Sequence, residues 1–173
     1  MTFASQFVLL DPQQHSVKSF DCGKPDMNLF LSRYADKNRK LGLSATWILT
    51  TQSPPDDIEK ATIAGYYTLA STTVSREQIP TDQSLPAYPV PVVLLARIVV
   101  NRCFQKQGLG EKTLISALRQ SVCLTDKGLP ALGVILDVLD NDALGFYQKF
   151  EVFQLVTDNP MRLFVSMNVL RKL

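Results

Sequence analysis

Two glycines, Gly108 and Gly110, stand where a nearly continuous apolar run, residues 92–100, gives way to a helical pattern. The run is typical of a strand buried on both faces. Glycine lets the backbone approach an anion closely, and the unpaired amides at a helix start point towards it with the positive end of the helix dipole. The segment Gln105–Glu111, called the glycine loop below, is therefore predicted to bind an anion.

Two common phosphate-binding patterns do not fit these glycines. A P-loop requires Gly-x-x-x-x-Gly-Lys-Ser/Thr, and this segment offers glycine only at positions 108 and 110. A dinucleotide fingerprint, Gly-x-Gly-x-x-Gly, requires a third glycine where the chain has Thr113, whose Cβ would block close contact. A glycine-rich helix start without a ligand is the plain alternative.

Composition excludes several other kinds of chemistry. The 173 residues carry one histidine, His15, and three cysteines without a C-x-x-C pair, so no metal site and no disulfide framework are expected. His15 lies in a polar stretch and is predicted to be a surface loop residue. The net charge of +2 does not by itself argue for nucleic-acid binding. No signal peptide or apolar run of membrane-spanning length is found, so the expected location is the cytoplasm.

The elements that must position the glycine loop follow from length and hydrophobic periodicity. The length predicts a single domain over residues 1–173. Asp26 is expected to cap the first helix, Gly42 to end it, and Asp140 or Asn141 to cap the last helix. Strands alternating with helices predict an α/β (α+β) fold with helices on both faces of a mixed sheet. Strands are predicted at residues 7–10, 47–51, 62–70, 92–100, 132–138, 153–156 and 163–169. Helices are predicted at residues 26–40, 108–124 and 141–149. A turn is predicted at residues 52–60 and an irregular segment at residues 71–89.

The glycine loop resembles the coenzyme A pyrophosphate loop of GCN5-related N-acetyltransferases (GNAT). Gln105-Lys106-Gln107-Gly108-Leu109-Gly110 fits that family's Gln/Arg-x-x-Gly-x-Gly/Ala at every fixed position. The resemblance implies a GNAT fold, with a mixed, mostly antiparallel central sheet of about six to seven strands, and acetyl-CoA as cofactor. It implies cofactor contacts from Ile98, Val99, Val100, Gln105, Lys106, Gln107, Gly108, Leu109, Gly110, Glu111, Asn141 and Phe146.

A second segment, residues 140–150, resembles the same family's Asn-x-x-Ala-x-x-Phe-Tyr-x-x-Phe-Gly-Phe, with one residue fewer near its start. Glu151 stands where the family usually has glycine. The family's tyrosine donates a proton to the departing coenzyme A thiolate, and the resemblance assigns that role to Tyr147. A phenol with a pKa near 10 can supply such a proton. Phe146 and Phe150 are expected to provide the packing and leave Tyr147 facing the site.

The first half of the chain narrows the resemblance to acetyltransferase toxins of type II toxin–antitoxin systems. Residues 20–23, Phe-Asp-Cys-Gly, match the opening of those toxins. Residues 63–70 resemble their Gly-Tyr-Tyr-Ala-Leu strand, and residues 89–98 their Pro-x-Pro-x-x-x-Leu-Gly/Ala-Arg-Leu. Cys22 is predicted to be a small buried hydrophobe rather than a catalytic group.

This resemblance implies acetyl transfer from acetyl-CoA to the α-amino group of the amino acid on charged tRNA, which blocks translation. Transfer would be direct, in a ternary complex, with Tyr147 as general acid. An α-amino group titrates near 7.7–8.0, so much of it is neutral without a dedicated base; Glu77, Asp82 and Asp137 are weak candidates for one. The implied partners are aminoacyl-tRNA and a cognate ribbon–helix–helix antitoxin that would make the DNA contacts, and a homodimer is compatible.

Basic residues are expected to contact the tRNA, although a solvated helix face explains a short basic run equally well. Arg97 interrupts an apolar strand, so an anionic partner is expected for it. Two other functions stay open: a GNAT enzyme that acetylates a small amine or a protein N-terminus, and an inert acyl-CoA-binding module. The predicted tRNA contacts are Arg33, Lys37, Arg39, Lys40, Arg76 and Arg97.

Overall fold

The computed structural model describes residues 2–52 and 59–173, so most of the predicted turn at 52–60 lies outside the described residues. The chain divides into two compact units, Met1–Leu69 with Arg97–Ala117, and Ala70–Ala96 with Leu118–Leu173. The single domain remains a prediction. Three long elements contribute residues to both units: β4 (Ala61–Val74), β5 (Val90–Val100) and α3 (Leu109–Asp126).

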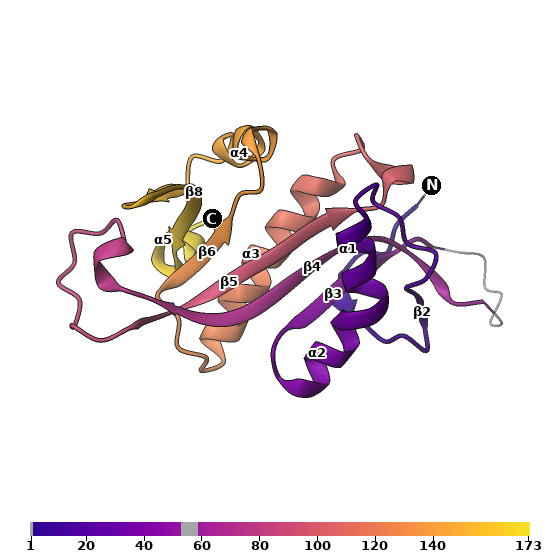
Figure 1. Ribbon diagram of the computed structural model, residues 1–173, viewed down its shortest axis with the longest axis horizontal. Coiled ribbons are helices and arrows are strands. Elements are labelled where there is room, and N and C mark those ends of the chain that lie inside the picture. Colours follow the sequence, from indigo (N-terminus) through magenta and orange to yellow (C-terminus); the bar gives the residue numbers. More distant parts are fainter. Residues whose placement is uncertain (1, 53–58) are drawn as a thin grey trace. The chain divides into compact units, whose positions relative to one another are not determined.

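The other elements each lie within one unit; Figure 1 shows the ribbon coloured along the sequence. The first unit contains β1 (Val8–Leu9), β2 (His15–Ser16), α1 (Pro25–Leu29), the π-helix η1 (Phe30–Tyr34), α2 (Ala35–Leu41), β3 (Ala45–Thr50) and the 3-10 helix η3 (Arg102–Phe104). The second unit contains the 3-10 helix η2 (Arg76–Gln78), β6 (Gly133–Asp137), α4 (Asn141–Gln148), β7 (Gln154–Val156), β8 (Asn159–Ser166) and α5 (Met167–Arg171).

The strand order confirms the predicted mixed, mostly antiparallel sheet. Paired strands follow the order β1-β3-β4-β5 in the first unit and β4-β5-β6-β8-β7 in the second, with β2 beside β4. β3 and β4, which correspond to the strands predicted on either side of the turn at 52–60, pair as an antiparallel hairpin, with Trp47 opposite Tyr67. β6 and β8 are antiparallel, as are β7 and β8, whereas β5 runs parallel to β6 and β2 parallel to β4. Among the eight strands formed by residues 2–52 and 59–173, seven correspond to predicted ones, and the eighth is the two-residue β2.

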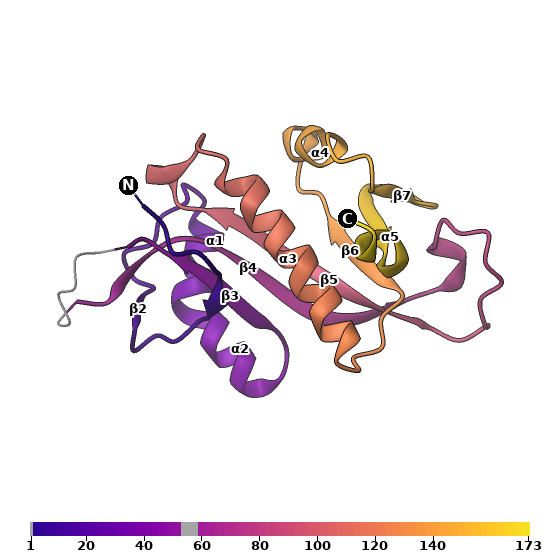
Figure 2. The same cartoon turned by 180° about the vertical axis from the view of Figure 1, so that it is seen from behind.

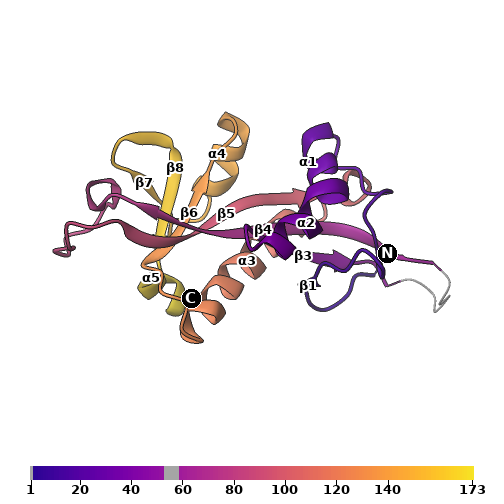
Figure 3. The same ribbon diagram turned by 60° about the horizontal axis from the view of Figure 1, so that its bottom comes forward.

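In the first unit, helices cover both faces of the strands. Successive residues of a strand point to opposite faces. Ile48 of β3 packs in a cluster with Leu31 of η1, whereas the next residue, Leu49, packs with Phe104 and Leu109. The face bearing Ile48 is therefore covered by α1, η1 and α2, and the opposite face by the start of α3, as Figures 2 and 3 show from behind and along the sheet.

The second unit has a core of its own. Val92 of β5, Ile135 of β6 and Phe164 of β8 are all buried there, together with Ile79 from the segment that follows β4. The prediction of an irregular segment at residues 71–89 is wrong at its start, because β4 continues to Val74 and η2 follows it.

The end of the chain differs from the prediction of a final strand at 163–169. The strand β8 begins earlier, at Asn159, and ends at Ser166. The Ser166 hydroxyl accepts a hydrogen bond from the backbone amide of Val169 (3.2 Å) and caps the short helix α5. A serine is a typical helix start signal, but here the valines around it continue the apolar pattern of the strand.

The first helix is present, but it differs in detail from the predicted 26–40. It begins with Pro25 at its first helical position, which suits a residue without a backbone N–H. Lys24 is the N-cap, so the prediction of Asp26 as cap is wrong, and Asp26 lies in the first turn. The π-helix η1 separates α1 from α2. Gly42 ends α2 with φ 78°, as predicted.

The prediction of His15 as a surface residue is also wrong. Only 6% of its surface is exposed, because it lies on β2, opposite Ala61 of β4. Its Nδ1 accepts a hydrogen bond from the backbone amide of Asp11 (2.9 Å), which fixes the ring in the tautomer with its proton on Nε2. Burial lowers the pKa of His15, although the nearby Asp11 carboxylate opposes this.

Candidate active site

The glycine loop has the backbone of an anion site. Gly108 has φ 80° and Lys106 φ 66°, both in the left-handed region. Glycine adopts that region freely, whereas it costs a residue with a Cβ roughly 1–2 kcal/mol. The amide of Lys112 donates to the Gly108 carbonyl (3.2 Å), so α3 starts directly after Gly108. The amides of residues 109–111 therefore have no partner within the helix and are suited to an anion.

Asn101 anchors the entrance to this loop. It is 6% exposed, and its backbone amide donates to the Ala64 carbonyl (2.8 Å). Its side-chain Nδ2 donates to the Ile63 carbonyl (3.1 Å), and its Oδ1 accepts from the amide of Cys103 (3.0 Å) and caps η3. Asn101 is not among the residues predicted for the site, although an asparagine at the start of a helical turn is a typical cap signal.

Close backbone packing fixes the start of α3 against the strands. A Cβ on Gly65 of β4 would lie 3.1 Å from the Val99 carbonyl of β5 and 3.5 Å from Thr113 Oγ1. The buried Thr113 hydroxyl donates to the Leu109 carbonyl (2.6 Å). Thr113, which rules out the dinucleotide fingerprint, is thus a packing residue at the junction of two strands and a helix.

The structure brings most of the predicted cofactor residues together in the first unit. Val99 is buried, and its neighbours Ile98 and Val100 are half-buried at the end of β5. The Gln105 side chain turns towards the protein, where its Nε2 donates to the Val100 carbonyl (3.2 Å). The loop residues Gln105, Lys106, Gln107, Gly108 and Glu111 are exposed, Gly110 is half-buried and Leu109 is buried.

The other predicted cofactor residues, Asn141 and Phe146, lie in the second unit on α4. The Asp140 carboxylate accepts a hydrogen bond from the amide of Ala143 (2.8 Å) and caps the helix. Of the two expected caps, Asp140 is therefore the cap and Asn141 the first helical residue. Phe146 packs edge-on against Phe150, with ring centroids 5.6 Å apart. None of the residues of α4 is buried.

Tyr147 is half-buried among aromatic rings. Its ring lies edge-on to Phe146 (5.2 Å between centroids) and to Phe153 (6.1 Å). Burial raises the pKa of Tyr147 to about 12. Its phenol therefore keeps its proton near neutral pH, the form that a proton donor requires. Packing comes from Phe153 as well as from the predicted Phe146, while Phe150 packs on Phe146.

Two of the three weak candidates for a general base are held in ion pairs. Asp137 accepts two hydrogen bonds from Arg162 (2.6 and 2.9 Å), and these bonds raise the pKa of the guanidinium. Glu77 pairs with Arg76 (3.1 Å), and hydrogen bonds lower the pKa of Glu77. The lowered pKa makes the Glu77 carboxylate a weak base. Asp82 lines a hollow of about 500 Å³ within the second unit.

Four of the six predicted tRNA contacts are gathered on η1 and α2. Arg33, Lys37, Arg39 and Lys40 are all exposed there. Lys40 forms an ion pair with Asp36 (3.0 Å). These side chains crowd one end of the helical segment, as the sequence predicts.

The other two predicted tRNA contacts already have partners in the protein. Arg76 donates to the Leu85 carbonyl (2.9 Å) as well as pairing with Glu77. The Arg97 guanidinium lies 3.6 Å from the centre of the Phe30 ring. Its partner is thus an aromatic face instead of the expected anion, since the ring quadrupole attracts a cation.

Two further observations concern the part of the chain that the structure describes. Within residues 2–52 and 59–173, no three His, Cys, Asp or Glu side chains are grouped so as to hold a metal ion. Over the same residues, no helix combines the length and the apolar character needed to cross a membrane.

No protein-family profile matches the chain. The tRNA-acetylating toxin of Mycobacterium tuberculosis is 31% identical to it over 160 residues, which cover 91% of this chain and 89% of that protein. The solved structure of a tyrosine-to-phenylalanine mutant of KacT has a TM-score of 0.85 and 21% identity, covering 99% of both chains. AtaT complexed with acetyl-methionyl-tRNAfMet has a TM-score of 0.84 and 23% identity, covering 98% of both.

The fold, with its glycine loop at the start of α3, is that of a GCN5-related acetyltransferase. The 31% identity to the mycobacterial protein, over 91% of this chain, identifies a narrower family within that class. The chain belongs to the family of tRNA-acetylating toxins.

Proposed function

We propose that this protein transfers the acetyl group of acetyl-CoA to the α-amino group of the amino acid carried by a charged tRNA, and thereby blocks translation. The observation that carries the proposal is the 31% identity to a tRNA-acetylating toxin over 91% of the chain. Independent support comes from the glycine loop, whose left-handed backbone at Lys106 and Gly108 precedes the unpaired amides of a helix start.

The residues present suit acetyl-CoA, which would supply an activated acetyl group and a thiolate leaving group. Residues 106–111 offer backbone amides to a pyrophosphate, and the Lys106 side chain adds a positive charge. The end of β5, residues 98–100, precedes this loop and offers backbone groups to the rest of the cofactor. Asn141 and Phe146 on α4 are the further contacts proposed from the second unit.

Tyr147 is proposed as the general acid for a direct transfer in a ternary complex. Its raised pKa, about 12, keeps the hydroxyl protonated until the thiolate forms. The acceptor α-amine, with an ordinary pKa of about 7.7–8.0, is partly neutral at physiological pH and can attack without a strong base. The ion pairs of Glu77 and Asp137 agree with a site that relies on no dedicated carboxylate base.

The exposed cations of η1 and α2 are proposed to bind the tRNA phosphates. Arg33, Lys37 and Arg39 are exposed, whereas Lys40 shares its charge with Asp36. Phosphate contacts of this kind give affinity that falls as salt rises. Arg76 and Arg97 are proposed as weaker contributors, because each already contacts another group of the protein.

The proposed protein partner is a cognate antitoxin that carries a ribbon–helix–helix domain. Solved structures of the same fold include AtaT bound to the C-terminus of the antitoxin AtaR, and a KacTA–DNA complex. An antitoxin segment that orders on binding can cover a large surface. With a net charge of +2, this chain has little sequence-independent affinity for DNA, so DNA contacts would come chiefly from the antitoxin. A homodimer is also proposed.

The deciding experiment measures transfer of radiolabelled acetyl groups from acetyl-CoA by the purified chain. Total charged tRNA, the same tRNA after deacylation, and a polyamine serve as parallel acceptors. Label should enter charged tRNA only, and alkaline hydrolysis should release it as N-acetyl amino acid. Label in the polyamine but not in charged tRNA would establish the small-amine acetyltransferase. Cofactor binding without transfer to any acceptor would indicate an acyl-CoA-binding module.

A further inference from the structure

The Phe-Asp-Cys-Gly motif, residues 20–23, takes no part in the chemistry proposed above, yet its contacts lead to the glycine loop. Asp21 Oδ1 accepts hydrogen bonds from the Gly23 amide (2.8 Å) and from Asn28 Nδ2 (2.9 Å). Asp21 Oδ2 lies 3.3 Å from Arg102 Nε, and the Asp21 carbonyl accepts from the Arg102 amide (2.8 Å). Since Arg102 begins η3, Asp21 holds the turn that connects β5 to the glycine loop.

Gln105 makes the second connection, at the first residue of the glycine loop. Its Nε2 donates to the Cys22 carbonyl of the motif (3.3 Å) and to the Val100 carbonyl at the end of β5 (3.2 Å). One side-chain amide thus joins three segments of backbone. The residue is exposed as a whole, but its carboxamide faces the protein, which leaves the exposed residues 106–108 on the outer side of the turn.

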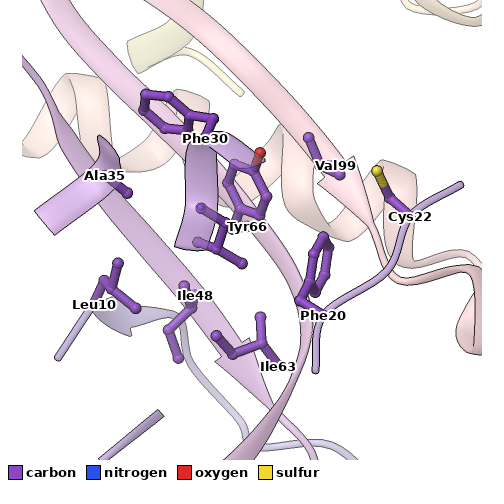
Figure 4. Packing of buried hydrophobic residues seen from close by; sticks show 10 residues of the cluster. Leu10, Phe20, Cys22, Phe30, Ala35, Ile48, Ile63, Tyr66 and Val99 are labelled. Carbon is purple, nitrogen blue, oxygen red and sulfur yellow. The ribbon is translucent and has the colours of Figure 1, made fainter. Parts of the chain in front are cut away.

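The motif is itself firmly held, so it can act as a support. Cys22 is buried, as predicted, in a cluster with Phe20, Tyr66 and Val99 (Figure 4). The backbone amide of Cys22 donates to Asn28 Oδ1 (2.9 Å). Nδ2 of the same Asn28 side chain donates to Asp21 Oδ1. The contacts that reach the loop therefore start from the core of the first unit.

We propose that Asp21 and Gln105 are positioning residues that hold the glycine loop in its anion-binding conformation before the cofactor arrives. A loop that must be ordered on binding loses part of its interaction free energy to that ordering, so a loop that is ordered in advance binds more tightly. The inference rests on the proposed function, because acetyl-CoA is the ligand whose affinity it concerns. Neither residue needs to touch the reacting atoms.

Two variants separate this role from general stability. Asp21→Asn keeps a side-chain oxygen for the Gly23 amide but removes the charge that faces Arg102. Gln105→Leu removes both donated hydrogen bonds with little change in volume. Each should weaken acetyl-CoA binding about threefold to tenfold in calorimetric titration. The KM for acetyl-CoA should rise by the same factor, whereas kcat at saturating acetyl-CoA should fall less. Amide hydrogen exchange at residues 106–111 of the free protein should accelerate.

The second unit offers a matched control. Asp126 and Arg171 form an ion pair of the same kind, Asp Oδ1 to Arg Nε at 3.2 Å, and both side chains are substantially exposed. Asp126→Asn removes a surface ion pair without touching the glycine loop. It should leave acetyl-CoA affinity and exchange at residues 106–111 unchanged. Arg102→Lys, which keeps the charge opposite Asp21, should retain most of the affinity.

These measurements distinguish a failure of the positioning role from a failure of the proposed function. Unchanged affinity and unchanged exchange in both Asp21→Asn and Gln105→Leu would overturn the positioning role. If the unaltered protein does not bind acetyl-CoA at all, the proposed function fails instead, and faster exchange in the variants would still show that the contacts order the loop. Should Gln105→Leu not fold, Asp21→Asn compared with Arg102→Lys decides the question.

Discussion

The glycine loop and the helix α4 are held by very different means. The loop is anchored by Asn101, Gln105 and Thr113, two of which are buried, and the helix that follows it buries Leu109 and Leu114. In contrast, α4 has no buried residue, and the contacts seen for it include its Asp140 cap and pairs of aromatic rings.

This difference suits the two tasks proposed for them. A binding loop gains affinity from being ordered in advance, because ordering it costs free energy at each binding event. A helix with few buried contacts belongs to the less stable parts of a fold and can adjust its position as substrates enter and leave. Substitutions in the loop region should therefore change cofactor affinity and stability, and substitutions in α4 should change turnover.

The largest expected effect is on the chemical step and comes from Tyr147→Phe. Loss of a general acid typically slows a reaction by about 10²–10⁴-fold. Turnover should fall within that range, whereas acetyl-CoA affinity and the free energy of unfolding should change little, because only an oxygen is removed from a half-buried ring. Steady-state kinetics with charged tRNA, together with thermal unfolding, provide the measurement.

Tyr66→Phe supplies the opposite control in the first unit. The Tyr66 hydroxyl is buried and donates to the Met27 carbonyl (2.8 Å), so its removal should cost about 1 kcal/mol of stability. A Tyr147→Phe enzyme with near-normal turnover would show that Tyr147 is structural. The raised pKa of Tyr147 adds a second check: the absorbance change of its phenol, taken as the difference between the unaltered protein and Tyr147→Phe, should appear above the ordinary tyrosine pKa of about 10.

The next largest effect is expected from Gly108→Val. The valine must adopt φ 80° and places a branched side chain where the pyrophosphate is proposed to bind. Calorimetry should detect a loss of acetyl-CoA affinity of about 100-fold or more. Gly128→Val introduces similar strain, at φ 116°, after the other end of α3 and should lower stability but spare affinity. Equal acetyl-CoA affinity in both variants would show that the pyrophosphate does not bind at this loop.

Glycine-to-alanine substitutions in the two regions should change the free energy of unfolding in opposite directions. Gly145 lies inside α4, and a Cβ there meets nothing within 4 Å, so Gly145→Ala should stabilise the protein by about 0.5–1 kcal/mol. Gly65→Ala should destabilise it by about 1–3 kcal/mol, because the new Cβ would be 3.1 Å from the Val99 carbonyl. Chemical denaturation measures both, and the contrast fails if both changes have the same sign.

The smallest expected effect is a pH dependence of stability in the first unit. Burial lowers the pKa of His15, so the unfolded chain takes up this proton at higher pH than the folded protein. The stability that the neutral His15 ring contributes is fully present above its pKa in the unfolded chain, about 6.5, and is lost as the pH falls below that value. The free energy of unfolding should decline between about pH 7 and pH 5, above the range where carboxylates titrate, and His15→Gln should flatten that slope.

The sequence predicts the elements of this fold well, because their apolar periodicity is strong. The buried strand before the glycine loop, the helix after it and the β3–β4 hairpin are all where the pattern places them. The predictions fail where a local signal competes with that pattern. Ser166 caps α5 within an apolar run, and Pro25 rather than Asp26 marks the start of α1.

Contacts between distant segments explain the other differences. Nothing local to the polar stretch around His15 shows that it pairs with β4. Likewise, the apolar strand around Arg97 predicts a partner for its charge, but the aromatic partner, Phe30, lies 67 positions earlier in the chain. The site residues remain proposals for the same reason, since a motif identifies residues but not their contacts with a ligand.

The π-helix η1 has a consequence for the charged surface that follows it. A π turn contains one residue more than an α turn, which is equivalent to a single inserted residue. Each residue of a helix advances its side chain by about 100° around the axis. The wider turn at residues 30–34 holds that extra residue, so the residue is taken up without a 100° change in the direction of Lys37, Arg39 and Lys40 relative to α1. Deleting Ser32 should therefore restore a continuous α-helix and leave this group of charges facing nearly the same direction.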